Sequence, residues 1–471
     1  MTGIVAYGAY VPYHRLDRRA IAEALRTPAG KGARAVASYD EDTTSMGVEA
    51  ARAALATAPA GVSPKALYFA TADPAYLDKT NATSIHAAVG LDPELLAVDM
   101  AGAVRSGVGA LLAAFDARQP VLAVLSDLRT GLAGGADERD GGDGAAAFLF
   151  ANGGASVIAE YVGGASVSAE FLERWRLPGE QASHQWEERF GEHAYVPLAK
   201  RALASAFKST NLTVEAVDHL IVTGVHPRAA RVITASSGVR PEAVADDLSS
   251  SVGNTGTAHP GLVLAGVLDK AEPNQVIALV VLADGASVLL LRTTDAIASY
   301  RPQQTVSSLI ASGKPDVSYA SFLTWRNMLR REPPRRPDPD RPAAPPSLRS
   351  ESWKFGFTGS RCQACGTRHL PPQRVCVRCR AVDQMELERL ADVQATIATY
   401  TIDRLAFSPS PPVVAAVIDF DGGGRYQCEL TDVDPDAVAI GDRVEMTFRR
   451  LFTADGVHNY FWKARPVRRN G

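Results

Sequence analysis

Four of the five cysteines stand in two closely spaced pairs. They are arranged as Cys362-x-x-Cys365 and Cys376-x-x-Cys379, with ten residues between the pairs. Four thiolates can surround one zinc ion in a closed tetrahedron, with no coordination position left for water. The alternative, two disulfides, is disfavoured in a reducing compartment. The spacing therefore predicts a structural zinc site.

Residues 1–361 contain no cysteine. A cysteine nucleophile is therefore excluded from this part. His226, in VTGVHPRAARVI, follows a predicted strand, and Asn254 stands in the turn Val252-Gly253-Asn254-Thr255. A histidine after a strand is also commonly a hydrogen-bonded structural residue, and asparagine favours tight turns by itself. A structural role for both stays open. Cys428, in a strand pattern, is predicted to be a small packed residue.

The segments that must position these residues occur twice in the same order. An apolar run precedes an aspartate-led turn of small residues and an Ala/Leu-rich helix; a buried strand and an Asp-Gly-Ala turn follow. The paired segments are 66–71 with 218–224, 99–107 with 247–256, 121–126 with 276–282, and 143–145 with 284–286. Strands alternating with helices in duplicate predict an α/β fold with two related halves.

This ordered set resembles the thiolase superfamily, closest to 3-hydroxy-3-methylglutaryl-CoA synthases and ketoacyl synthase III proteins. The resemblance covers residues 1–300, and its most specific motifs are Gly142-Asp143-Gly144-Ala145-Ala146, His226 and the Gly253-Asn254-Thr255 turn. It implies a duplicated thiolase fold with αβαβα layers, an acyl-CoA thioester as substrate and a homodimer. His226 and Asn254 match the family's catalytic histidine and asparagine.

Two other family residues are missing. The nucleophilic cysteine of the family falls on Val104, in the turn 101–107, and the acid/base glutamate falls on Ala72, beside Asp73. Val104, Arg105, Ser106 and Gly253 are expected to contact substrate, and Ser106 stays open as a substitute nucleophile.

Without the cysteine, His226 and Asn254 can still stabilise an enolate, which needs donors and no nucleophile. The favoured function is aldol formation or retro-aldol cleavage of a β-hydroxyacyl-CoA. Candidates for the base are Tyr195, Tyr76, Asp73 and His259; Tyr195 lies where the family has an aromatic residue near the pocket. One alternative is a non-catalytic acyl-CoA-binding or scaffold partner of a thiolase or hydratase. Another is synthase-like condensation or acyl transfer without a covalent intermediate.

Four parts are expected along the chain. The thiolase-like domain takes residues 1–300, with halves of about 1–165 and 166–300. Residues 301–350 hold a connecting helix (319–331) and a Pro/Arg-rich linker (333–347). A rubredoxin-like zinc ribbon (351–388) and five short strands typical of an OB-fold (389–471) follow. This pair resembles acyl-CoA-associated proteins that accompany thiolase-like partners.

The composition gives no indication of a highly charged binding partner. The formal net charge is -3 and hydrophobic residues make up 46% of the chain, which is ordinary for a globular protein. Neither nucleic acid nor a membrane is expected as a partner. The opening MTGIVAYGAYVP lacks the features of a signal peptide, so a cytoplasmic location is expected.

Overall fold

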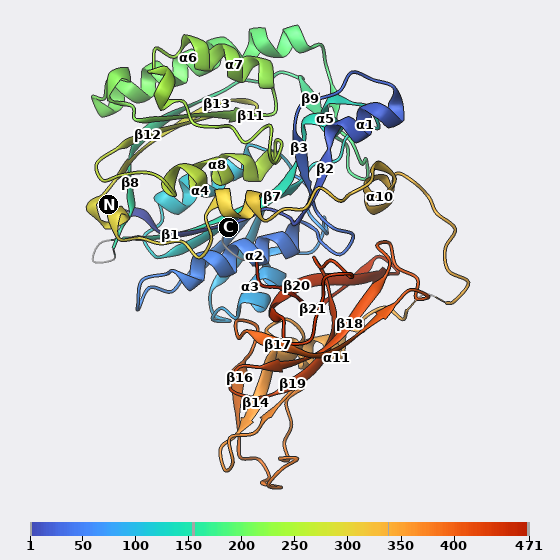
Figure 1. Cartoon of the computed structure of the whole chain (residues 1–471). Coiled ribbons are helices and arrows are strands. Elements are labelled where there is room, and N and C mark those ends of the chain that lie inside the picture. Colours follow the sequence, from blue (N-terminus) through green and yellow to red (C-terminus); the bar gives the residue numbers. More distant parts are fainter. Residues whose placement is uncertain (1, 153–155, 338, 469–471) are drawn as a thin grey trace.

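A nine-stranded mixed sheet is the framework of the first domain in the computed structural model, which describes residues 2–152, 156–337 and 339–468. Its order is β11-β12-β13-β8-β1-β7-β6-β4-β5 (Figure 1). The strands are β1 (Thr2–Tyr10), β4 (Ala66–Thr71), β5 (Leu96–Ala101), β6 (Val121–Leu128), β7 (Asp143–Asn152), β8 (Ala159–Ser168), β11 (His219–Gly224), β12 (Val276–Leu282) and β13 (Gly285–Thr293).

The strand order repeats. In the first half β1 and β6 flank β7 in antiparallel pairings, and β4 runs parallel to β6. In the second half β8 and β12 flank β13 in antiparallel pairings, and β11 runs parallel to β12. The order β1-β7-β6-β4 thus recurs as β8-β13-β12-β11, which confirms the predicted α/β fold of two related halves.

Helices form three layers around this sheet (Figure 1). The middle layer holds α4 (Ser106–Phe115) and α8 (His259–Leu268), both apolar and rich in small residues. The outer layers hold α2 (Thr43–Ala56) with α3 (Ala82–Val89), and α6 (Glu188–Thr210) with α7 (Pro227–Ser236). Among the described residues, no helix has both the length and the apolar character needed to cross a bilayer.

Shorter elements surround these layers. They are α1 (Arg18–Leu25), α5 (Ala136–Asp140), α9 (Val306–Ala311), β2 (His14–Asp17), β3 (Ala33–Val36), β9 (Arg174–Trp175) and β10 (His184–Gln185).

The connection to the second part differs from the sequence prediction. Helix α10 (Tyr319–Trp325) ends six residues before Arg331, because the Arg326 side chain turns inward to Asp143 and Asn327 adopts a left-handed φ of 56°. Helix α11 (Ala344–Arg349) begins inside the stretch predicted to be extended. The prolines in its first turn are compatible with a helix, since the N–H that proline lacks has no intrahelical partner there.

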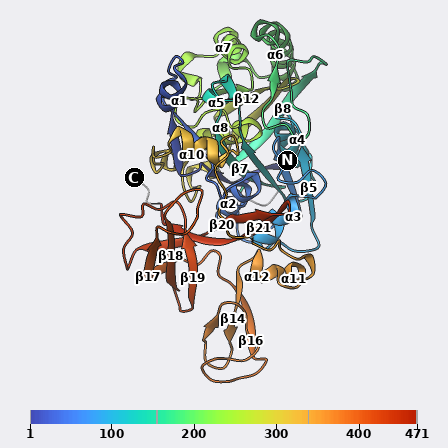
Figure 2. The same cartoon turned by 90° about the vertical axis from the view of Figure 1, so that its right-hand side faces the viewer.

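The second part consists of a small sheet and a closed barrel. The sheet has the order β15-β14-β16, and the barrel has the order β17-β18-β19-β21-β20. Their bounds are α12 (Glu351–Lys354), β14 (Thr358–Cys362), β15 (Arg368–His369), β16 (Met385–Arg389), β17 (Ala395–Asp403), β18 (Val413–Phe420), β19 (Arg425–Leu430), β20 (Arg443–Ala454) and β21 (Val457–Pro466). The barrel packs against α2, and the small sheet projects away from the first domain (Figures 1 and 2).

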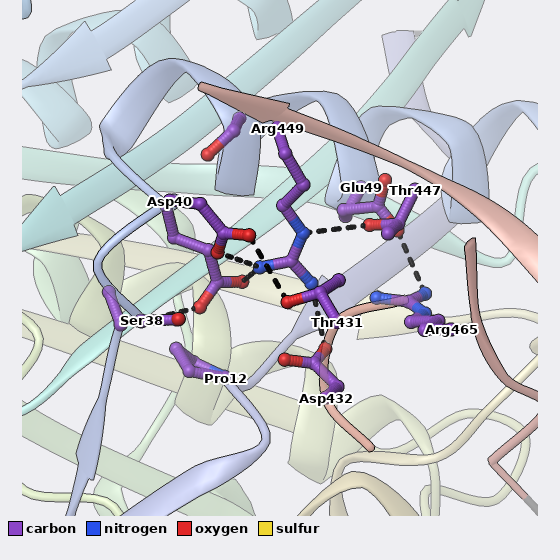
Figure 3. A network of polar contacts seen from close by, with 12 residues as sticks. Pro12, Ser38, Asp40, Glu49, Thr431, Asp432, Thr447, Arg449 and Arg465 are labelled. Atoms are coloured by element: carbon purple, nitrogen blue, oxygen red, sulfur yellow. Dashed lines mark hydrogen bonds and ion pairs between the residues drawn. The ribbon is translucent and has the colours of Figure 1, made fainter. Parts of the chain in front are cut away.

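A buried network of charges fixes the barrel to the first domain. Arg449 of β20, which is fully buried, lies 2.5 Å from a Glu41 carboxylate oxygen and 2.7 Å from one of Asp432. Lys463 of β21 lies 3.0 Å from Asp40. Figure 3 shows Arg449 between Asp40 and Asp432. Because an unpaired buried charge is very unfavourable, these contacts require both domains to be in place.

Candidate functional site

His226 and Asn254 line one pocket of about 310 Å³ at the end of β11. The strand ends at Gly224, and His226 precedes the first turn of α7. Other residues in the wall are Glu173, Arg174, Asp137, Trp186 and Val225. The pocket therefore combines the two predicted donors with charged groups and a few apolar side chains.

The imidazole of His226 is buried and held between two backbone groups. Its Nδ1 accepts a hydrogen bond from the Ala229 N–H at 3.0 Å, so the histidine serves as the N-cap of α7. That bond places the ring proton on Nε2, which donates to the Glu188 carbonyl oxygen at 2.9 Å. A ligand oxygen that accepts from Nε2 must take the place of Glu188, in the first turn of α6.

The Asn254 side chain is held by backbone groups of two glycines. Its Nδ2 donates to the Gly224 carbonyl oxygen at 2.7 Å, and its Oδ1 accepts from the Gly256 N–H at 2.9 Å. The second Nδ2 proton has no partner among the residues that the structure describes. Gly253 has a φ of 90°, and a Cβ there would stand 2.2 Å from the Gly141 carbonyl oxygen. Gly253 is therefore required by the turn itself.

Val104, which the sequence predicts at the position of the family nucleophile, lies in apolar surroundings. Val104 and Ala72 belong to one small buried cluster with Ala283, against which Val225 packs. Val225 also lines the pocket of His226, so the cluster adjoins the pocket. Val104 and Ala72, where the sequence predicts the family nucleophile and acid/base, have side chains that can carry neither an acyl group nor a proton.

The residues that follow Val104 do not line the His226 pocket. The Arg105 guanidinium donates to the carbonyl oxygen of Asp284, in the other half of the domain. Ser106 is half-buried and begins α4. The structure thus places the predicted substrate contacts Val104, Arg105 and Ser106 beside the pocket rather than in its wall.

Tyr195 lies near the predicted donors. Its ring centroid is 5.9 Å from that of His226, and burial raises the pKa of its hydroxyl above the ordinary value. Helix α6 carries this tyrosine one turn after Gly191, which contacts His226. A neutral Tyr195 can donate a hydrogen bond and is a poor base at neutral pH.

The other candidate bases lie elsewhere. The Tyr76 hydroxyl oxygen accepts the His458 N–H at 2.8 Å, and Asp73 pairs with Arg176 at 3.2 Å. Both side chains lie at the junction with the barrel because the 72–81 segment turns toward it. His259 is fully buried, and burial lowers its pKa to about 4. None of the three lines the His226 pocket.

Two acidic residues at the site carry no recognisable sequence signal. Glu173 is 6% exposed and lines the pocket, but it lies in a polar stretch without periodicity. Asp127, at the end of β6, accepts the Thr257 N–H at 2.9 Å and thereby supports the turn that carries Asn254. Burial raises the pKa of Asp127 to about 6.

The aspartate of the Gly142-Asp143-Gly144 motif has a structural role. Asp143 is fully buried and pairs with two guanidinium groups, those of Arg34 and Arg326. It also accepts the Ala37 N–H at 2.7 Å and the Arg129 N–H at 2.9 Å. It thus ties the connector after α10 to the start of β7.

The four paired cysteines form one cluster. The sulfur atoms of Cys362, Cys365, Cys376 and Cys379 all lie within 4.8 Å of one another. Such a set of four thiolates suits tetrahedral zinc and leaves no position for a fifth ligand. Cys428 lies apart, buried in the barrel wall.

Comparison with family descriptions identifies the second part. Residues 356–386 match the rubredoxin-like zinc ribbon domain of ChsH2, and residues 388–449 match the C-terminal OB-fold domain of ChsH2. A DUF35 domain-containing scaffold protein of Methanocaldococcus jannaschii is 32% identical over 126 residues, which are 26% of this chain and 89% of that protein. The predicted ribbon and OB-fold are thereby confirmed.

The first part matches a different group of proteins. A hydroxymethylglutaryl-CoA synthase of Pyrococcus horikoshii is 30% identical over 296 residues, which are 60% of this chain and 83% of that protein. A crystal structure of an HMG-CoA synthase complexed with CoA shares the fold with a TM-score of 0.58 at 16% identity, over 68% of this chain and 89% of that one. The chain therefore belongs to the hydroxymethylglutaryl-CoA synthase family and carries a DUF35-type zinc ribbon and OB-fold in the same polypeptide.

Proposed function

We propose that this protein makes or breaks a carbon–carbon bond in a β-hydroxyacyl-CoA by aldol chemistry, without a covalent acyl-enzyme. One observation carries the proposal. The nucleophile position, Val104, is sealed in an apolar cluster, while His226 and Asn254 remain together in the adjoining pocket. A pocket that keeps its donors and lacks a nucleophile is suited to enolate chemistry.

Binding would begin with the thioester carbonyl oxygen. This oxygen accepts the second Nδ2 proton of Asn254, and it accepts the Nε2 proton of His226 once the Glu188 carbonyl gives way. In cleavage, a base takes the proton of the β-hydroxyl group, the Cα–Cβ bond breaks, and its electron pair forms the enolate. The aldehyde or ketone leaves, and a proton returned to Cα gives the shorter acyl-CoA.

Zinc has no part in these steps. The four cysteines would hold a structural ion that supports the small β14–β16 sheet, which lies outside the first domain (Figure 1). The only other cofactor-like group in the proposal is the coenzyme A of the substrate. A cytoplasmic location and a homodimer are also part of the proposal. The homodimer is supported by β5, whose outer edge is covered by no described strand.

A second candidate is a non-catalytic acyl-CoA-binding partner of a thiolase or hydratase. It is favoured by the backbone contacts of His226, both of whose ring nitrogens are already satisfied. The two functions differ in turnover, since the second requires saturable binding without any change in the thioester.

The test is incubation with a panel of β-hydroxyacyl-CoAs, including branched and ring-bearing ones, followed by mass spectrometry of the CoA species. The first function requires release of acetyl-CoA or propionyl-CoA with an aldehyde or ketone, and loss of this release in His226→Asn. Binding without products supports the second candidate. An acyl adduct on Ser106 in the intact protein would contradict the nucleophile-free mechanism.

A further inference from the structure

Glu173 is a buried carboxyl group without a partner. Its side chain makes no hydrogen bond or ion pair with any residue that the structure describes, and its Oε2 atom is closed off from solvent. Its neighbour Arg174 is engaged by Asp137 at 2.6 Å instead. Because nearly all buried polar groups in proteins are hydrogen-bonded, an isolated carboxyl in a pocket wall indicates a ligand contact.

Gly191 brings this carboxyl group next to the catalytic candidate. A Cβ on Gly191 would stand 2.5 Å from Nε2 of His226 and 2.9 Å from Cγ of Glu173. The side chains of His226 and Glu173 therefore both approach α6 at Gly191. Only glycine, which has no Cβ, fits there. Glu173 lies just before β9, so it reaches the pocket from a segment outside the apolar Val104 cluster.

The surroundings of Glu173 favour the protonated form of its carboxyl group. Burial raises its pKa above the ordinary value, which Arg174 and His226 only partly oppose. Once ionised, a carboxylate with a raised pKa is a stronger base than an ordinary one. The charged or titratable groups that act on it or lie near it are Arg174, His226, Asp137, Asp284 and Tyr195.

We propose that Glu173 accepts the β-hydroxyl proton of the substrate, an inference that rests on the proposed aldol function. The ionised carboxylate takes the proton as the C–O bond becomes a carbonyl and the Cα–Cβ electron pair moves into the enolate. The same proton then returns to Cα, so the carboxylate is regenerated and no other reactant is needed. Glu173 supplies the carboxyl that Ala72 cannot.

The test compares Glu173→Gln with Glu170→Gln, a nearby exposed control. With a β-hydroxyacyl-CoA that the wild-type protein cleaves, Glu173→Gln is expected to lower kcat at least a hundredfold and to change KM less than threefold. The fall of kcat on the acidic side of its pH profile should disappear with it. The control should match wild type, and unfolding curves should show both variants folded.

Binding provides a readout that does not need turnover. The thioethers S-(3-hydroxybutyl)-CoA and S-butyl-CoA lack the carbonyl and cannot be cleaved. At pH 8 the hydroxylated compound is expected to bind the wild-type protein roughly tenfold more tightly, because it donates a hydrogen bond to a carboxylate. This preference should vanish in Glu173→Gln.

The outcomes separate the two proposals. Cleavage that survives Glu173→Gln overturns the role of Glu173 and leaves the aldol function standing. No cleavage by wild type, with the binding preference present and dependent on Glu173, rejects the function and upholds the hydroxyl contact. Equal binding of both thioethers to wild type overturns the contact.

Discussion

His226 donates its Nε2 proton to the backbone carbonyl oxygen of Glu188, 2.9 Å away. The same ring caps α7 through Nδ1. One side chain thus holds the first turn of two different helices and faces the pocket between them. The hydrogen bond to Glu188, at the start of α6, must therefore break before the ring can donate to a ligand. Ligand binding is thereby coupled to movement of residues near Glu188.

Two substitutions of His226 should separate capping from catalysis. Asparagine can cap a helix, so His226→Asn should lose cleavage with little loss of stability. His226→Ala should lose cleavage and also about 1 kcal/mol of unfolding free energy. Urea unfolding and a cleavage assay check both. Retained activity in His226→Asn would exclude the ring N–H as the donor.

Gly191→Ala should displace the His226 ring. The added Cβ would stand 2.5 Å from the ring, closer than van der Waals contact allows, so the ring must move. A displacement of this size should cost about a hundredfold in kcat. The control is Gly109→Ala in α4, where a Cβ meets nothing within 4 Å. The control should keep its activity and gain up to about 1 kcal/mol from helix propensity. Equal activities of the Gly191→Ala and Gly109→Ala variants would refute the close packing of Gly191 against His226.

Arg449→Met should destabilise the domain junction. It leaves Glu41 buried without its cation and removes one of the two guanidinium partners of Asp432, the other being Arg468. This loss costs about 3–5 kcal/mol. Limited proteolysis should then cut the connector between α10 and α11 faster than in wild type. Arg425→Met, which removes an exposed partner of Asp419 on the same barrel, should behave like wild type. An unchanged cutting rate in Arg449→Met would show that the network does not hold the barrel.

Acid should weaken the contacts of Asp40 and Asp432 in the same junction. Burial alone would raise the pKa values of Asp40 and Asp432, but the neighbouring cations outweigh it and hold both below the ordinary value. A lowered folded-state pKa contributes stability above the unfolded pKa, and this contribution is lost as the pH falls. Small-angle scattering should therefore show expansion below about pH 4. Expansion that begins near neutral pH would contradict these assignments.

Zinc removal should unfold the ribbon alone. Atomic emission should find one zinc per chain in wild type and none in Cys376→Ser, because three thiolates hold zinc poorly. Cys428→Ala should keep its zinc, since Cys428 lies outside the cluster. Far-UV circular dichroism should remain largely unchanged, as the first domain does not depend on the ion. Zinc retained in Cys376→Ser would argue against four-cysteine coordination.

The sequence was informative where the chemistry was local. The cysteine spacing, the paired strands and the glycine turn at Asn254 are each set by neighbouring residues, so their patterns predicted the fold and the metal cluster. The sequence predicts Tyr76 and Asp73 as bases near His226, but Tyr76 contacts the barrel and Asp73 pairs with Arg176. The contact of Tyr76 is made with His458, which is almost four hundred residues away in the sequence. Glu173 lies in an irregular connection, whose path no periodic pattern fixes.

The ion pairs that the barrel makes with Asp40 and Glu41 also have a consequence for folding during protein synthesis. The first domain leaves the ribosome well before β20 and β21, so during synthesis these carboxylates lack Arg449 and Lys463 and are open to water on the side that the barrel later covers. They lose that water only when Arg449 and Lys463 arrive, near the end of translation. A nascent chain therefore carries a temporary acidic patch. The final two strands bury this patch in the interface between the first domain and the barrel.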